Sequence, residues 1–250
     1  EHNMVAAQLN QVRRDISRRD FNQAMTAGYD ALDRKDFDVA EQQFKNARRI
    51  MPSAQETESA IAQARTGRTR ARIDSLADKA RAAEQSENWD IAVKDYEAIL
   101  NIDETVVFAR SGMIRGKTRA DLDQRLQQII SQPGRLQDQS IYNRAQQTWR
   151  EAASLSQAGP KLKRQLDQVR EQLALASTPI AVLLQSDELT DVTVYRVAKL
   201  GTFRRQQLEL KPGTYTAVGV RSGYRDVRRK FSIAHGKNNP VIDISCTEPI

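Results

Sequence analysis

The sequence predicts an α + β chain in separate domains, with helices over residues 1–177 and strands over residues 178–250. Before residue 177, apolar residues recur at spacings of three and four, as on one face of a helix. After Thr178, Val, Thr, Tyr and Ile alternate with polar residues, and Gly and Pro separate the runs. Pro179 disfavours helix at the residue before it. We therefore expect an N-terminal α-hairpin solenoid followed by a small antiparallel β-sandwich.

The first helix is expected over residues 20–34, and a preliminary helix over residues 3–19 either joins it or precedes it. The next helix is expected over residues 37–51, after a turn of only four residues, Asp33 to Asp36, so these two helices must pack antiparallel. Pro and Gly punctuate the later part of this region. The remaining helices are expected over residues 53–86 (disturbed at Gly67), 89–102, 104–131, 137–157 and 160–177.

Two segments of the helical part share one residue spacing. The first set is Gly28, Ala31, Phe37, Ala40, Phe44, Ala47 and Pro52, and the second is Ala80, Ala83, Trp89, Ala92, Tyr96, Ile99 and Glu104. This spacing predicts a helical hairpin in which small residues let the second helix approach, and such a unit must stack on neighbours. It resembles the tetratricopeptide repeat. The second copy departs from that family at Ala80, where glycine is usual, and at Glu104, where proline is usual. The copies are 52 residues apart (Ala40 to Ala92) rather than ~34.

The resemblance implies binding of a protein partner on a concave face lined by the first helix of each hairpin. The expected partner-binding residues are Asn22, Met25, Tyr29 and Arg81. Some members of the resembled family hold the C-terminal carboxylate of a partner with a cationic clamp on the first helices. The first-helix positions of this sequence do not form such a clamp, which argues against capture of a C-terminal carboxylate.

The C-terminal part is expected to contain six strands, with a type II turn at Lys211-Pro212-Gly213. The pattern Leu208-x-Leu210-x-Pro212-Gly213-x-Tyr215, then Gly223-Tyr224, Phe231-x-Ile233 and Gly236, resembles the PEGA domain, a small β-sandwich. Residues 193–201 stand where that family has its first hairpin, although Lys199 to Thr202 replaces its usual Gly-x-x-Pro turn. The resemblance implies a non-catalytic, envelope-associated bacterial module. The strands are expected over residues 180–185, 191–198, 203–210, 214–221, 225–233 and 240–246.

The net charge of +7, from 39 basic and 32 acidic residues, raises the question of an anionic partner. The excess is spread over both parts, with 28 basic against 25 acidic residues before Thr178 and 11 against 7 from Thr178 onward. Contacts to an anionic membrane or glycan surface are expected at Arg65, Arg68, Arg72, Arg228, Arg229 and Lys230. Strand alternation should send neighbours in the run Arg228-Arg229-Lys230 to opposite faces, so nucleic acid is the less favoured partner.

Nothing in the sequence predicts catalysis. Phosphate-binding, dinucleotide-binding and nucleophile-elbow motifs do not occur, and carboxylates are scattered beside Lys and Arg. Cys246, the single cysteine, is expected to be a buried core thiol, and His235 a solvated turn residue. We therefore expect no enzyme activity, no cofactor and no metal site. Composition also excludes collagen-like, disulfide-stapled and membrane-spanning classes.

The expected function is that of a non-enzymatic scaffold or adaptor that holds a protein partner in a bacterial cell-envelope complex. The chain starts with Glu1 rather than Met, so we expect an upstream membrane anchor and a periplasmic location. The alternative is a basic binder of nucleic acid, in the cytoplasm, or of an anionic envelope surface or glycan.

Overall fold

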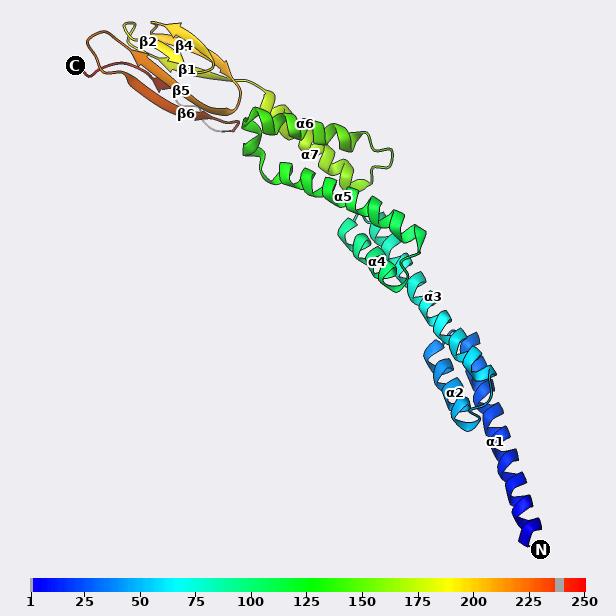
Figure 1. Ribbon diagram of the computed structural model, residues 1–250. Coiled ribbons are helices and arrows are strands. Elements are labelled where there is room, and N and C mark those ends of the chain that lie inside the picture. Colours follow the sequence, from blue (N-terminus) through cyan, green and yellow to red (C-terminus); the bar gives the residue numbers. More distant parts are fainter. Residues whose placement is uncertain (1, 237–240) are drawn as a thin grey trace. The chain divides into compact units, whose positions relative to one another are not determined.

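The computed structural model describes residues 2–236 and 241–250, and it places the helices first and the strands after them (Figure 1). The predicted order of helical and strand-rich parts is therefore confirmed. The helices are α1 (His2–Asp33), α2 (Phe37–Ile50), α3 (Glu56–Gln85), α4 (Trp89–Ile102), α5 (Val107–Ser131), the 3-10 helix η1 (Pro133–Gln137), α6 (Gln139–Ala153) and α7 (Pro160–Ser177).

The chain divides into two compact units, residues 1–117 and residues 118–250, and the division falls inside α5. The change from helix to strand lies elsewhere, between Ser177 and Ile180. The predicted boundary at residues 177/178 marks this change in secondary structure, and its role as a domain boundary stays a prediction.

Helix α1 is one continuous helix, so the preliminary helix fuses with the one that follows it. Its residues from Met4 to Arg18 are all exposed. Four of them, Val5, Leu9, Val12 and Ile16, follow a spacing of four, three and four residues and are 45–55% exposed. Such a spacing is typical of a helix face that packs on another helix.

The turns that join α1 to α2 and α3 to α4 have the same backbone conformation. Lys35 and Glu87, 52 residues apart, both adopt positive φ, at 60° and 54°. The following residues, Asp36 and Asn88, are the N-caps of α2 and α4, and each donates its backbone N–H to a carbonyl five residues earlier (2.8 Å in both). A left-handed residue after a helix satisfies its last carbonyls and reverses the chain, so both helix pairs are short antiparallel hairpins.

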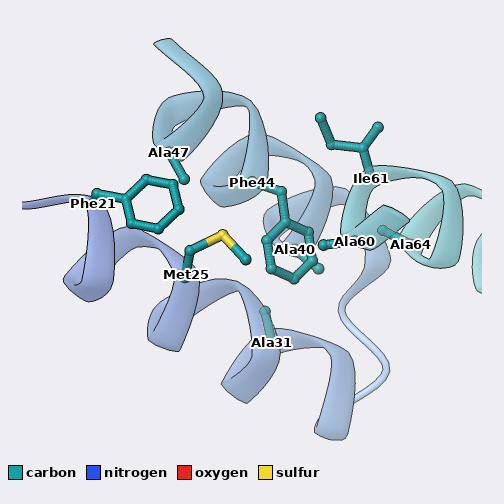
Figure 2. Packing of buried hydrophobic residues seen from close by; sticks show 9 residues of the cluster. All are labelled: Phe21, Met25, Ala31, Ala40, Phe44, Ala47, Ala60, Ile61 and Ala64. Carbon is teal, nitrogen blue, oxygen red and sulfur yellow. The ribbon is translucent and has the colours of Figure 1, made fainter. Parts of the chain in front are cut away.

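The first hairpin packs with the start of α3 around Phe44, which is fully buried (Figure 2). Gly28 of α1 lies against the Phe44 ring: a Cβ there would be 2.4 Å from Cε1. Most of the other buried members are alanines, whose small side chains let the helices approach closely. Its buried members are Phe21, Met25, Ala31, Ala40, Phe44, Ala47, Ala60, Ile61 and Ala64.

Helix α3 passes through Gly67 without a break, so the expected disturbance there is wrong. The physical reason for a glycine at this point is packing. A Cβ on Gly67 would be 2.3 Å from Cε1 of Phe37, the first residue of α2. Tertiary contact thus uses the missing side chain, and the helix tolerates a glycine cost of about 1 kcal/mol.

In residues 118–250, α6 and α7 share a core with the second half of α5. Asp138 caps α6 by accepting from the backbone N–H groups of Ser140 and Ile141. The indole N–H of Trp149 on α6 donates to the Leu166 carbonyl on α7 at 3.0 Å. Pro160 opens α7 as predicted, because the first turn of a helix needs no N–H from it.

The strands form two sheets. β1 (Ile180–Gln185) pairs antiparallel with β4 (Arg205–Leu210) and parallel with β7 (Ile242–Asp243). The other sheet is antiparallel, with strand order β3-β2-β5-β6. Side chains of both sheets contribute to one buried cluster, which contains Val182, Leu184, Val192, Val194, Leu210, Ala217, Phe231, Ile233 and Ile244. The strands of the second sheet are β2 (Asp191–Val194), β3 (Ala198–Gly201), β5 (Gly213–Val220) and β6 (Val227–Ile233).

The single strand expected over residues 191–198 is wrong, because the chain reverses within it. Residues 195–197 form a turn in which Arg196 has a φ of 61°. The turn uses neither Gly, Asn nor Asp, so no turn signal marked it in the sequence. The last expected strand, over residues 240–246, shortens to Ile242–Asp243 in the described residues, and Pro240 lies outside them.

Candidate functional site

The candidate site is an open hollow of about 610 Å³ within residues 1–117. Helix α3 lines it with residues at spacings of four and three, and α5 lines it at spacings of three and four, so each helix presents one face. Tyr96 of α4 also lines the hollow. The lining residues are Ala77, Arg81, Glu84, Tyr96, Phe108, Ser111 and Arg115.

The apolar part of the hollow combines a buried and an exposed ring. Tyr96 is only 3% exposed and Ala77 is equally buried, whereas Phe108 is 50% exposed. Tyr96 reaches this position because α5 has a glycine opposite it: a Cβ on Gly112 would be 2.3 Å from the Tyr96 Cζ atom. One helical turn further, a Cβ on Gly116 would be 2.8 Å from Val93. The two glycines thus let α5 approach α4 closely.

An ion pair joins α3 to α5 at the hollow. The Arg115 guanidinium donates to Glu84 through Nε at 3.0 Å and through Nη2 at 2.8 and 3.1 Å. Paired donation of this kind is stronger and more directional than a single contact. Burial raises the pKa of the Tyr96 hydroxyl, and the negative charge of Glu84 raises it further. The phenol beside this pair is therefore neutral at pH 7.

Arg81, predicted from the sequence, lies in this hollow. Its Nη2 contacts Asp78 at 3.2 Å, its Nε donates to the Ala77 carbonyl at 3.3 Å, and its side chain is 65% exposed. An exposed pair of this kind contributes less than about 1 kcal/mol, so Arg81 can exchange Asp78 for another carboxylate at little cost.

The other three predicted partner-binding residues lie on α1 and do not line the hollow. Asn22 is exposed, and Tyr29 is 45% exposed with its ring edge-on to Phe44 at 5.1 Å between centroids. Met25 is only 8% exposed and belongs to the cluster around Phe44, so its side chain packs the core. The structure brings Met25 and Tyr29 together around Phe44 and places Arg81 in a different cluster of side chains.

Two of the predicted anionic-surface residues are already paired with carboxylates. Arg65 contacts Glu41 at 2.8 Å, and Arg68 contacts both Asp38 at 2.8 Å and Glu41 at 3.0 Å. Glu41 is nearly buried and also pairs with Lys45 at 2.9 Å. Hydrogen bonds from Lys45 and Arg65 lower the pKa of Glu41 to about 2. This cluster holds α2 against α3, and Arg72 lies exposed further along α3.

The other basic candidates lie on β6, an edge strand of the four-stranded sheet. All three are exposed, and Arg228 pairs with Val218 while Lys230 pairs with Thr216 across the strands. Arg229 pairs with Ala217 and belongs to the same face of β6 as the buried residues Phe231 and Ile233, because every second residue of a strand shares a face. The alternation expected from the sequence is present, because only Arg228 and Lys230 share the outer face.

Sequence reasoning missed Glu84, Phe108, Ser111 and Arg115. The repeat spacing found in the sequence ends at Glu104, four residues before Phe108. Two features of the sequence could have drawn attention to this region. Arg115 belongs to a basic cluster at residues 110–119, and Gly112 stands four residues after Phe108 on the same helix. Glu84 had no distinguishing pattern, because its pairing with Arg115 joins residues 31 positions apart.

Cys246 is 1% exposed and its Sγ contacts the Gly219 carbonyl at 3.3 Å, so the prediction of a buried thiol is confirmed. His235 is exposed, and its Nε2 lies 2.9 Å from the Leu175 carbonyl. Across residues 2–236 and 241–250, no three His, Cys, Asp or Glu side chains cluster as a metal site would require. None of the helices in the same residues combines the length and apolar character needed to cross a membrane.

No family model matches the chain, and no curated protein matches it. Among solved structures, the chain is similar to "Structure of surface layer protein SbsC, domains 1-6", with 12% identity and a TM-score of 0.23. The match covers 90% of this chain and 45% of that one, so the chain spans less than half the length of the structure it matches. A likeness at this TM-score carries no argument about the fold or function of this chain.

Proposed function

We propose that this chain is a non-enzymatic scaffold that binds a protein partner through the hollow between α3, α4 and α5. The observation that carries the proposal is the half-exposed Phe108 ring beside buried Tyr96, with Arg81 and the Glu84–Arg115 pair at the same hollow. An apolar anchor point with charged groups around it is the usual composition of a protein-binding surface.

The proposed architecture of residues 1–117 is a pair of tetratricopeptide-like hairpins. Three kinds of equivalence at an offset of 52 residues support it. The turn residues Lys35 and Glu87 share positive φ, as described above. The small residues Ala40 and Ala92 are both fully buried. The aromatic residues Phe44 and Tyr96 also stand 52 residues apart, and each is buried. The glycines that they contact are not equivalent, because Gly28 lies on the helix before Phe44 and Gly112 on the helix after Tyr96.

For the strands we propose a PEGA-like β-sandwich. The shared core of the two sheets supports this, as does the Tyr215 hydroxyl, which donates to the Lys211 carbonyl at 2.8 Å. The type II turn expected at Lys211-Pro212-Gly213 is wrong, because Gly213 lacks the positive φ that this turn requires and instead begins β5. The resemblance to an envelope-associated module is also the basis for proposing a bacterial cell-envelope location, in the periplasm.

Photo-crosslinking in living cells tests the scaffold proposal. A photoreactive phenylalanine analogue replaces Phe108, and the matched control carries it at Lys94, an exposed residue of α4 outside the hollow. We expect one discrete crosslinked protein from position 108, weakened by Arg81→Glu and absent from position 94. Equal crosslinking at both positions, or none at position 108, would contradict the proposal.

The alternative is contact with an anionic envelope surface or glycan, and the exposure of Arg228 and Lys230 on one face of β6 favours it. Co-sedimentation with vesicles of anionic lipid tests this alternative. Loss of binding in Arg228→Glu/Lys230→Glu, with little change in Arg229→Glu, would support it. Equal loss in both variants would indicate only non-specific attraction to the net charge of +7.

A further inference from the structure

A second hollow, of about 130 Å³, lies within residues 118–250 where α5, η1 and α6 meet. Its apolar lining comes from Ile129 on α5, Leu136 on η1, and Ile141 and Ala145 on α6. Leu136 and Ala145 are 4% and 3% exposed, so these two side chains form part of the core beneath it. A volume of this size is comparable to that of an apolar cavity that holds one benzene molecule, so it accommodates a single branched or aromatic side chain.

Three arginines line the same hollow, and none of its lining residues is acidic. Arg125 is neutralised, because it pairs with Asp121 at 2.9 Å and with Glu151 at 2.9 Å. Arg135 and Arg144 differ from it: across residues 2–236 and 241–250, neither is within ion-pair distance of a carboxylate.

Neighbouring groups compensate these two charges only in part. The Nη1 of Arg135 donates to the neutral Gln132 side chain at 3.2 Å. Asp138, the acidic residue at the start of α6, accepts from the backbone N–H groups of Ser140 and Ile141 through Oδ1 at 2.8 and 3.2 Å. Asp138 also attracts Arg135 electrostatically, although no ion pair within 4.0 Å joins the two. Arg144 has no carboxylate at ion-pair distance in the described part of the chain, so the hollow keeps an excess of positive charge.

We infer that this hollow binds a short acidic segment of a partner protein, in which one apolar side chain lies between carboxylate residues. The apolar side chain fills the hollow and loses its exposure to water. The flanking carboxylates accept hydrogen bonds from Arg135 and Arg144, whose planar guanidiniums suit paired donation. Charge complementarity selects an acidic segment. Tyr and Phe rings, on which the bases of a single-stranded nucleic acid would stack, do not line this hollow.

The inference is independent of the proposed binding at α3, α4 and α5, because no residue lines both hollows. Fluorescence anisotropy on the full chain tests it with a labelled peptide, Glu-Glu-Leu-Glu-Glu. The comparison peptides replace Leu with Ser, or all four Glu with Lys. We expect the Leu peptide to bind at least tenfold more tightly than either comparison peptide at the same salt concentration.

Substitutions assign the binding to this hollow. Arg135→Glu/Arg144→Glu should weaken binding at least tenfold, whereas Arg135→Lys/Arg144→Lys, which keeps the charge, should stay within about threefold. The control Arg150→Glu/Arg164→Glu makes the same change in net charge at exposed arginines outside the lining, and it should bind as the original chain does. Circular dichroism melting confirms that each variant folds.

Three results would overturn the inference. One is equal weakening by the control pair, which would indicate attraction to net charge alone. Another is equal affinity for the Leu and Ser peptides, which would mean that the hollow is not used. The third is tighter binding of an oligothymidine at the same salt concentration, which would point to nucleic acid.

Discussion

The Phe44 ring lies directly over Gly28. A Cβ atom added to Gly28 would be only 2.4 Å from Cε1, 2.6 Å from Cδ1 and 2.8 Å from Cζ of the Phe44 ring. Phe44 is fully buried, so its ring has no open space into which to move. The contact therefore fixes the separation of α1 and α2, and a single added methyl group should disturb it.

Gly28→Ala should lower the free energy of unfolding by about 1–3 kcal/mol through overpacking. Helix propensity alone would raise the free energy of unfolding, because alanine favours a helix by about 1 kcal/mol over glycine. The sign of the measured change therefore shows whether packing or helix propensity is the larger effect. Chemical denaturation measures it. Gly134→Ala is the control, because nothing lies within 4 Å of its added Cβ, and it should not destabilise the chain. A stabilised Gly28→Ala would show that Phe44 and Gly28 are not in tight contact.

Stability should depend on pH through Glu41. Its pKa falls from an ordinary value of 4.5 to about 2 in the folded chain, first because of the hydrogen bond from Lys45 and then that from Arg65. A carboxyl group whose pKa is lower in the folded chain than in the unfolded chain stabilises the fold at any pH above its unfolded pKa. This stabilisation is lost as the pH falls from the unfolded pKa toward the folded pKa. The melting temperature should therefore fall between about pH 4.5 and pH 2.

Glu41→Gln should lower the free energy of unfolding at pH 7 by about 1–3 kcal/mol and flatten the pH dependence between pH 4.5 and 2. The control Glu58→Gln removes an exposed pair with Arg48, at 2.8 Å, and should cost less than about 1 kcal/mol. An unchanged pH profile in Glu41→Gln would place the acid sensitivity elsewhere, for example at Asp138 or Glu151, whose pKa values are also lowered.

The hydroxyl of Tyr96 should titrate above the ordinary tyrosine value of about 10. Burial is the main cause of its raised pKa, and the negative charge of Glu84 adds to it. Glu84→Gln should therefore lower the Tyr96 pKa, because it removes that charge and leaves Arg115 to stabilise the phenolate. Ultraviolet difference titration, with Tyr96→Phe to assign the signal, measures the change. A pKa that rises in Glu84→Gln would contradict the geometry of the hollow.

Lys35 occupies a left-handed conformation, at φ 60°, which costs a non-glycine residue about 1–2 kcal/mol. Lys35→Gly should stabilise the chain by about 0.5–1 kcal/mol after the extra unfolded-state freedom of glycine is subtracted. Lys35→Ala keeps a Cβ at this position and serves as the control, with no comparable gain. Thermal unfolding compares the two, and equal melting temperatures would show that the turn carries no strain.

Local periodicity and the Pro and Gly signals were enough to predict the helical and strand-rich parts and most helix limits. Trp89–Ile102 and Pro160–Ser177 match their predicted ranges. The small residues paired with aromatic ones in the helical hairpin were also visible, since repeat spacing reports packing between adjacent helices.

The contacts that these residues make could not be predicted from local patterns, because they form only in the folded chain. Gly67 reads as a weak point in a helix until Phe37 is seen to pack on it, and Met25 reads as a surface candidate until Phe44 covers it. The hairpin turn at Arg196 and the pair of Glu84 with Arg115 depend on contacts remote in sequence. Periodicity cannot predict such features, because the energy that favours them comes from burial and charge pairing between distant segments.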